Sequence, residues 1–132
     1  MTDIHDQNVR RLLDAPNVAV ISTQNADGSI HSTVVWQSLE DGRVAVNSAR
    51  GRRWPSNLER DPNATLVVVD PDNPYSYVQI RGRAQESGED ADEHINQLSK
   101  KYIGQDEYPY RQPGEERVKF TIEPDKVIFV KQ

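Results

Sequence analysis

The arginines of one short segment are the residues of this sequence best suited to chemistry. Four of them fall within eleven residues of a chain whose formal net charge is −5 at pH 7: Arg50, Arg52, Arg53 and Arg60. The segment follows an apolar run typical of a strand and precedes a short predicted helix, with Gly51 permitting a tight turn and Pro55 at the first helical position. Backbone N–H groups at a helix start, beside arginine side chains, form a site for an anion such as a phosphate group. The alternative interpretation is a solvated basic loop that balances nearby acids.

The other ionisable residues form no pattern of a catalytic triad or a metal site. His5, His31 and His94 are far apart in the sequence, and we expect ordinary polar surface positions for them, although His31 lies in a predicted strand that could face a pocket. The acidic run between Glu86 and Glu93 is the expected start of a solvated helix. The chain has no cysteine, which excludes disulfides, thiolate metal ligands and a cysteine nucleophile. If the protein is an enzyme, a bound cofactor is expected to carry the chemistry, and no side chain is identified as a proton donor.

Length and composition predict one domain spanning residues 1–132. The apolar fraction of 35% is low for a monomer, so we expect a partner subunit to complete part of the core. No apolar run is long enough to span a membrane, and the polar, acidic N-terminus is unlike a signal peptide, so a cytoplasmic protein is expected. The acidic charge balance argues against nucleic-acid binding, which needs a broad basic face.

The elements that must position the arginines are mostly strands. The patterns predict helices over 6–14, over two turns ending at Asp61-Pro62, and over 89–103 with Ser87 as its cap. Strands are predicted over 18–23, 30–39, 44–47, 64–69, 75–86, 118–122 and 127–130, and the apolar run 64–69 is expected to be covered on both faces. Seven strands joined early by tight turns at Asp27-Gly28 and Asp41-Gly42 predict a mainly β fold, an antiparallel β-barrel with peripheral helices. No glycine-rich dinucleotide motif follows a strand.

Several short motifs occur in an order that resembles a known family. They are Thr33-Val34-Val35-Trp36, Val46-Asn47-Ser48, Gly51-Arg52, Asn57-Leu58-Glu59-Arg60-Asp61-Pro62, Asp70-Pro71-Asp72-Asn73-Pro74-Tyr75, Arg81-Gly82-Arg83-Ala84, Lys101-Tyr102-Ile103-Gly104 and Pro113-Gly114-Glu115-Glu116-Arg117-Val118. The ordered set covers nearly the whole chain. It resembles the pyridoxamine 5'-phosphate oxidase-like split β-barrel family, with its FMN-binding fold, and more closely the branch that depends on the deazaflavin coenzyme F420, which is common in actinobacteria.

The resemblance implies a homodimer with two cofactor sites at the subunit interface. The flavin-like ring would lie against 33–36 and the edge of 46–48, the phosphate at Gly51-Arg52-Arg53 and the following helix start, and the partner subunit would close the pocket with Tyr75 and Tyr77. The cofactor-binding residues expected on this basis are Thr33, Val34, Val35, Trp36, Asn47, Ser48, Arg50, Gly51, Arg52, Arg53, Trp54, Asn57, Tyr75 and Tyr77.

Two departures from the family pattern refine this expectation. Trp54 stands where the family often has a basic residue, so either Arg53 takes over that role or Trp54 stacks on the cofactor or substrate. The sequence also lacks the arginine-containing C-terminal segment of true pyridoxamine-phosphate oxidases, which argues against synthesis of pyridoxal phosphate.

The function implied is that of an F420H2-dependent reductase. The reduced deazaflavin would pass a hydride to a conjugated small molecule such as an enone, a tetrapyrrole bridge or a quinone. The protein would act by holding donor and acceptor close together and by excluding water. Two alternatives remain open at this point: an FMN-binding oxidoreductase of the same fold, and a non-catalytic protein that binds flavin, deazaflavin or haem.

Overall fold

The computed structural model describes residues 3–132, which form a seven-stranded antiparallel sheet and three helices. The strands are β1 (Ala19–Gln24), β2 (Ile30–Val35), β3 (Gln37–Glu40), β4 (Arg43–Ala49), β5 (Asn63–Asp70), β6 (Asn73–Glu86) and β7 (Arg117–Val130). The helices are α1 (Gln7–Asp14), α2 (Arg53–Arg60) and α3 (Ala91–Ile103). Among residues 3–132, no helix is both long and apolar enough to cross a membrane.

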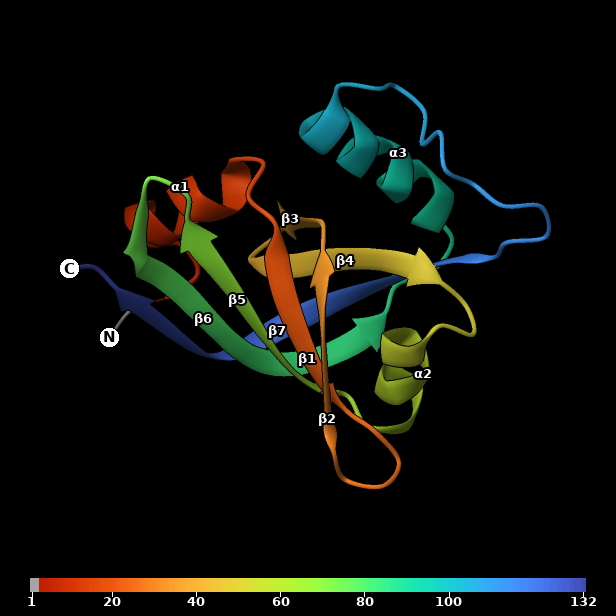
Figure 1. The fold of residues 1–132 in the computed structure, drawn as a ribbon, viewed down its shortest axis with the longest axis horizontal. Coiled ribbons are helices and arrows are strands. Elements are labelled where there is room, and N and C mark those ends of the chain that lie inside the picture. Colours follow the sequence, from red (N-terminus) through yellow and green to blue (C-terminus); the bar gives the residue numbers. More distant parts are fainter. Residues whose placement is uncertain (1–2) are drawn as a thin grey trace.

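The order of the strands makes the sheet curl. Neighbouring strands follow the order β2-β1-β5-β6-β7-β4-β3, so the two edge strands, β2 and β3, are consecutive in the chain and separated only by Trp36. The two edges of the sheet must therefore approach each other at Trp36. Figure 1 shows the resulting half-barrel, with the three helices at its periphery. This confirms the predicted mainly β fold with peripheral helices.

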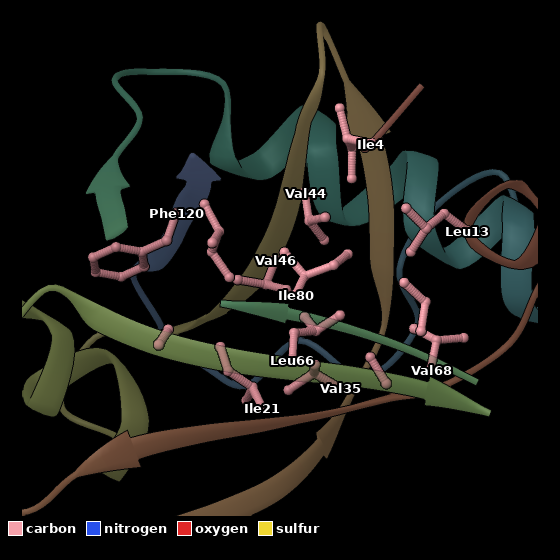
Figure 2. Packing of buried hydrophobic residues seen from close by; sticks show 14 of the residues in the cluster. Ile4, Leu13, Ile21, Val35, Val44, Val46, Leu66, Val68, Ile80 and Phe120 are labelled. Atoms are coloured by element: carbon pink, nitrogen blue, oxygen red, sulfur yellow. The ribbon is translucent and has the colours of Figure 1, made fainter. Parts of the chain in front are cut away.

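The core fills the concave side of the sheet. Side chains on successive strands alternate between the two faces, and Ile21, Leu66, Ile80 and Ile122 are fully buried on the inner face. Figure 2 shows Ile21, Leu66 and Ile80 among the side chains that meet there. Burying one such side chain stabilises the fold by about 1.5–3 kcal/mol. Helix α1 adds Val9, Leu12 and Leu13 to the same core.

The predicted burial of the strand over 64–69 on both faces is wrong for the single chain. Ala64, Leu66 and Val68 are buried, whereas Val67 is half-buried and Val69 is 44% exposed. Within residues 3–132, the outward side chains Thr65, Val67 and Val69 of β5 are half-buried or exposed, so one side of an apolar strand is left open.

Several predicted boundaries also differ from the structure. The strand expected over 30–39 is interrupted at Trp36, and the strands expected over 118–122 and 127–130 form one strand, β7. A bulge bends β7 against β6 opposite Gly82. A Cβ atom at Gly82 would clash with the carbonyl oxygen of Glu123, so only glycine fits the close approach of the two backbones.

Two helix starts are displaced from their predicted positions. Helix α2 begins at Arg53, which makes Pro55 its third residue rather than its first. Proline is still tolerated there because the first turn of a helix does not use its N–H groups. Helix α3 begins at Ala91 with Asp90, not Ser87, as its N-cap residue, and the Asp90 carboxylate is bound to Lys119 instead of capping the helix.

Candidate functional site

A cavity of about 400 Å³ opens where β2, the end of β4, the start of α2 and α3 come together. Its volume is within the range of about 300–1,000 Å³ typical of small-molecule sites. Nine of the predicted cofactor-binding residues line it: Thr33, Val34, Val35, Trp36, Asn47, Ser48, Arg52, Arg53 and Trp54. His31 lines it as well, as its place in the predicted strand allowed. The structure thus brings together residues from three separate motifs.

The other five predicted residues do not line this cavity. Gly51 has a φ of 94° and serves the turn before α2. Asn57 is buried, and its Nδ2 donates to Thr23 Oγ1 at 3.0 Å and to Asn25 Oδ1 at 2.9 Å, which ties α2 to β1. Tyr75 and Tyr77 lie on the outer face of β6, away from the cavity in the same chain.

Arg50 is held by carboxylates rather than facing the cavity. Its guanidinium makes ion pairs with Glu59 at 2.7 Å, Glu86 at 3.0 Å and Glu116 at 2.7 Å. Hydrogen bonds to Glu86 and Glu116 raise the pKa of Arg50. In the single chain Arg50 therefore joins the arginine segment to α2, to the end of β6 and to the residue that precedes β7, and its positive charge is already neutralised.

Arg52 and Arg53 give the cavity a cationic end. Arg52 lies 3.7 Å from Glu115, and its side chain is 54% exposed. Arg53 is exposed and makes no ion pair within residues 3–132. Neither the Arg52 side chain nor any other caps α2, and Pro55 has no N–H, so the N–H groups of Arg53 and Trp54 remain for an anion. Two guanidinium groups and two backbone amides suit a phosphate group.

Trp54 contributes to the floor of the cavity rather than to its opening. Its side chain is 5% exposed and packs against Phe120 with 5.9 Å between ring centroids. Of the two roles considered for this departure from the family pattern, the geometry favours Arg53 as the basic residue, since Arg53 is exposed beside the cavity while Trp54 belongs to the core.

Aromatic side chains form another wall of the cavity. The Trp36 ring stacks on Tyr102 with 5.2 Å between centroids, and Tyr108 meets Trp36 edge-on at 6.1 Å. Tyr110 in turn meets Tyr108 edge-on at 5.7 Å. The Tyr102 hydroxyl donates to the Asn17 carbonyl oxygen at 2.6 Å, which fixes the ring that supports Trp36. The cavity therefore presents flat apolar surface as well as positive charge.

A family comparison agrees with the order of the motifs. A sequence model described as pyridoxamine 5'-phosphate oxidase matches residues 5–131. The chain belongs to the pyridoxamine 5'-phosphate oxidase family. No curated protein matches the sequence significantly.

Solved structures of proteins with diverse descriptions share the fold of this chain. An F420 reductase is 22% identical, with 90% of this chain and 94% of that chain covered and a TM-score of 0.78. A conserved hypothetical protein from Mycobacterium tuberculosis is 20% identical, with 98% and 84% covered and a TM-score of 0.76. A heme binding protein from Mycobacterium smegmatis is 18% identical, with 94% and 52% covered and a TM-score of 0.72. At these identities the likeness shows the fold.

The prediction that His94 lies at the surface is wrong, because the structure buries this side chain. His94 is 1% exposed, and its Nδ1 lies 3.1 Å from Asn47 Nδ2 while its Nε2 lies 2.9 Å from Ser38 Oγ. Burial, together with the positive charge of Lys119, lowers the pKa of His94 to about 4, so the ring is neutral at pH 7. The available signal was its helical spacing, three residues after Ala91 and four before Leu98, which places His94 on the buried face of α3.

The hydrogen bonds of Asn47 determine which nitrogen of His94 carries the proton. Asn47 Nδ2 donates to the Ala91 carbonyl oxygen at 2.9 Å, and Asn47 Oδ1 accepts from Arg117 Nε at 3.0 Å. The amide nitrogen therefore faces His94, and Nδ1 must accept from it, which leaves the proton on Nε2 to donate to Ser38. Every polar atom of Asn47 is used, so this residue shapes the cavity without a free group for a ligand.

The residues that sequence reasoning missed come from α3 and the segment after it. Tyr108, Tyr110 and Arg117 line the cavity together with Ile95 and Leu98. The loop between Gly104 and Gly114 has no periodicity to predict where its tyrosines point. Arg117 begins a strand whose apolar alternation starts one residue later, and an arginine at a strand end is ordinarily solvated.

Proposed function

We propose that this protein is an F420-dependent oxidoreductase that transfers a hydride from the reduced deazaflavin to a conjugated small molecule. The observation that carries the proposal is the placement of Arg52, Arg53 and the uncapped start of α2 in one cavity with the apolar wall of β2. A phosphate fits the cationic end, and a flat ring fits Val34, Val35 and Trp36. The F420 reductase with the same barrel supports the choice of cofactor.

The residues of this chain bind and orient rather than react. Arg53, Arg52 and the amides of α2 would hold the phosphate, and the β2 wall would hold the ring. The bound deazaflavin supplies the hydride. Binding both molecules in one cavity converts an encounter between them into a step within one complex, and the aromatic wall excludes water from the reacting atoms. Solvent supplies the proton that completes the reduction.

F420 is favoured over FMN because of its charge. Its oligoglutamate tail adds several carboxylates to the phosphate, and FMN has none. An acidic protein needs a local cluster of cations to hold such a ligand, and Arg53 is an exposed cation that makes no ion pair within residues 3–132.

We also propose a homodimer that completes the site. Val34, Val20 and Val67 lie side by side on the outer face of β2, β1 and β5, and Val34 is 63% exposed while it lines the cavity. Val69 and Tyr77 continue this open apolar surface onto β6. A second copy seated on the surface would bury it and wall the open side of the cavity. Sedimentation of a stable, folded 15.0 kDa monomer at micromolar concentration would overturn the dimer.

The test of cofactor choice is a fluorescence titration of the purified protein with F420 and with FMN. We expect F420 to bind at low micromolar concentration or better and more tightly than FMN at low salt. Arg52→Ala should weaken F420 binding tenfold or more, because a charge-assisted hydrogen bond contributes about 1.5–3 kcal/mol. Arg60→Ala is the matched control, since Arg60 binds the Gln24 carbonyl oxygen and Asn57 instead of lining the cavity.

Three results would contradict the assignment. Equal F420 affinities for the wild type and Arg52→Ala would remove the phosphate site. Tighter binding of FMN than of F420 at low and high salt, with a yellow protein as purified, would assign FMN as the cofactor instead of F420. If F420 binds but no enone or quinone oxidises its reduced form, the protein would be assigned as a non-catalytic carrier of the cofactor.

A further inference from the structure

We propose that Arg117 binds the oxygen atom of the acceptor molecule, and that the acceptor is a planar, conjugated compound carrying a carbonyl or carboxylate oxygen. The inference rests on the proposed function for the hydride donor, but the oxygen site is defined by residues of this chain alone.

Arg117 is a buried cation with an unused pair of donors. Its side chain is 2% exposed and lines the cavity. Nε donates to Asn47 Oδ1 at 3.0 Å, and Nη1 donates to Glu115 Oε1 at 2.6 Å. Guanidinium has five N–H donors, and within residues 3–132 Nη2 makes no hydrogen bond. Only Gln37 Oε1 and Ser76 Oγ are both fully buried and without a hydrogen-bond partner among the side-chain atoms of residues 3–132. Nη2 therefore keeps some exposed surface, and because Arg117 lines the cavity, we take Nη2 to be open to it.

The guanidinium is held in one orientation. Its central carbon lies 5.0 Å from the centroid of the Tyr108 ring, which covers one face. Asn47 cannot turn, because its amide is fixed between Ala91 and His94. Neutral His94 is in turn fixed by Ser38. This chain of hydrogen bonds, which joins β3, α3, β4 and β7, orients the free edge of Arg117 before any ligand binds.

The surroundings of Arg117 select the shape of the ligand. Tyr108, Tyr110 and Trp36 form the aromatic wall beside it. Aromatic faces favour flat, polarisable molecules, and a guanidinium edge favours an oxygen acceptor with bidentate or paired geometry. Glu115 lies 2.6 Å from Arg117 and 3.7 Å from Arg52, so it offsets most strongly the charge of Arg117, and this makes a single polar oxygen group a better match for Arg117 than a polyanion.

The chemistry of the proposed step follows from this placement. The β-carbon of the acceptor receives a hydride, with its two electrons, from the reduced deazaflavin. The π electrons of the C=C bond shift to form a C=C bond to the carbonyl carbon, and the carbonyl π electrons move onto oxygen. Arg117 Nη2 donates to the resulting enolate oxygen and stabilises its charge. Water then protonates the α-carbon, which restores the carbonyl group.

The test separates acceptor binding from cofactor binding. Arg117→Lys keeps a positive charge beside Glu115 but loses the planar fork. We expect its kcat/KM for cyclohex-2-en-1-one with reduced F420 to fall about a hundredfold, while its Kd for F420 changes less than threefold. Arg111→Lys is the matched control, because Arg111 lies in the loop that precedes β7, pairs with Asp92 at 2.6 Å and does not line the cavity.

A binding measurement without cofactor provides the second readout. By calorimetry, 2-naphthoate should bind the wild type and bind Arg117→Lys at least tenfold more weakly, whereas uncharged 2-naphthalenemethanol should bind both equally. If Arg117→Lys misfolds, the double variant Arg117→Met with Glu115→Gln replaces it, since removing both charges leaves no unpaired buried carboxylate.

The outcomes are distinguishable. An F420 Kd that weakens as much as kcat/KM would assign Arg117 to the cofactor and overturn the proposal, as would unchanged naphthoate binding. If the wild type binds no F420, the proposed function fails. In that case, loss of naphthoate binding in Arg117→Lys still supports the oxygen site, and its retention overturns it.

Discussion

Arg53 and Arg117 line the same cavity but are built into the fold in opposite ways. Arg53 is exposed at the start of α2 and makes no ion pair within residues 3–132, whereas Arg117 is buried and held by Asn47, Glu115 and Tyr108. A free arginine supplies charge and adapts to a flexible anion. A fixed arginine supplies geometry and depends on every group that holds it. Substitutions around Arg117 should therefore alter stability, and substitutions around Arg53 should alter binding.

The largest effect is expected at Asn47, on the fixed side of this comparison. Asn47→Leu leaves Arg117 Nε and His94 Nδ1 without partners. Each unsatisfied buried group costs about 1–3 kcal/mol, so the free energy of unfolding should fall by roughly 2–6 kcal/mol in urea denaturation. Asn63→Ala, at an exposed asparagine that bonds only the nearby Asp61, should change it by about 0.5 kcal/mol or less. Similar small losses for both variants would show that the chain of hydrogen bonds does not stabilise the fold.

Protonation of His94, which belongs to the hydrogen-bonded group around Arg117, should lower the free energy of unfolding as the pH falls. Its pKa is lowered from 6.5 to about 4, first by burial and then by Lys119 and Arg117, while Glu40 and Asp90 act in the opposite direction. Between these values the unfolded chain binds a proton that the folded chain does not. The stabilisation is therefore complete above about pH 6.5 and is lost as the pH falls to about 4, by up to about 3 kcal/mol.

The variant His94→Gln tests the assignment of this pH dependence. Glutamine can keep both hydrogen bonds without titrating, so its unfolding free energy should be nearly flat from pH 6.5 to 4. The pKa values of Asp90 and Glu115 are also lowered in the folded state, and their contributions are lost at more acidic pH. A wild type and variant with parallel pH profiles would assign the slope to other groups.

Arg53→Ala should affect cofactor binding strongly and the free energy of unfolding little, which is the reverse of the pattern expected around Arg117. We expect the Kd for F420 to rise tenfold or more, because a charged contact worth about 1.5–3 kcal/mol is lost. The free energy of unfolding should change by less than about 0.5 kcal/mol, since Arg53 makes no ion pair to lose. Titration and urea denaturation of one preparation measure both quantities. A variant that unfolds easily but binds F420 normally would invert the comparison between the two arginines.

The smallest effect expected is the difference in salt dependence between two ligands. Exposed charges are screened by salt far more than buried ones. F420 carries more negative groups than FMN, so its affinity should fall more steeply between low and high salt. Fluorescence titration of both cofactors at two salt concentrations gives the two slopes. Equal slopes would indicate that only the phosphate contacts the protein.

The sequence predicted the fold because most of its signals are local. Alternating residues in β6 and β7 and the turn at Asp41-Gly42 each depend on a few neighbours. Nine of the residues that line the cavity were also named in advance, through the resemblance in motif order. The family match confirms that resemblance at the level of the family, and the roles of these residues in binding stay predictions.

The residues that escaped prediction are placed by contacts between distant parts of the chain. Arg117 is fixed by Asn47, 70 residues earlier, and His94 by Asn47, 47 residues away. Arg50 was assigned to the cofactor because the sequence does not show that the fold brings Glu86 and Glu116 to its guanidinium. A charge in a sequence indicates what a residue can bind, and only the fold decides which partner it meets.

Trp36 connects the architecture of the sheet to the shape of the cavity. It is the single residue between the two edge strands, and the same indole ring stacks on Tyr102 and forms part of the cavity wall. A ligand that stacks on this ring would contact the residue at which the two edges of the sheet meet. The meeting of the two edge strands and the wall of the cavity thus depend on the same side chain.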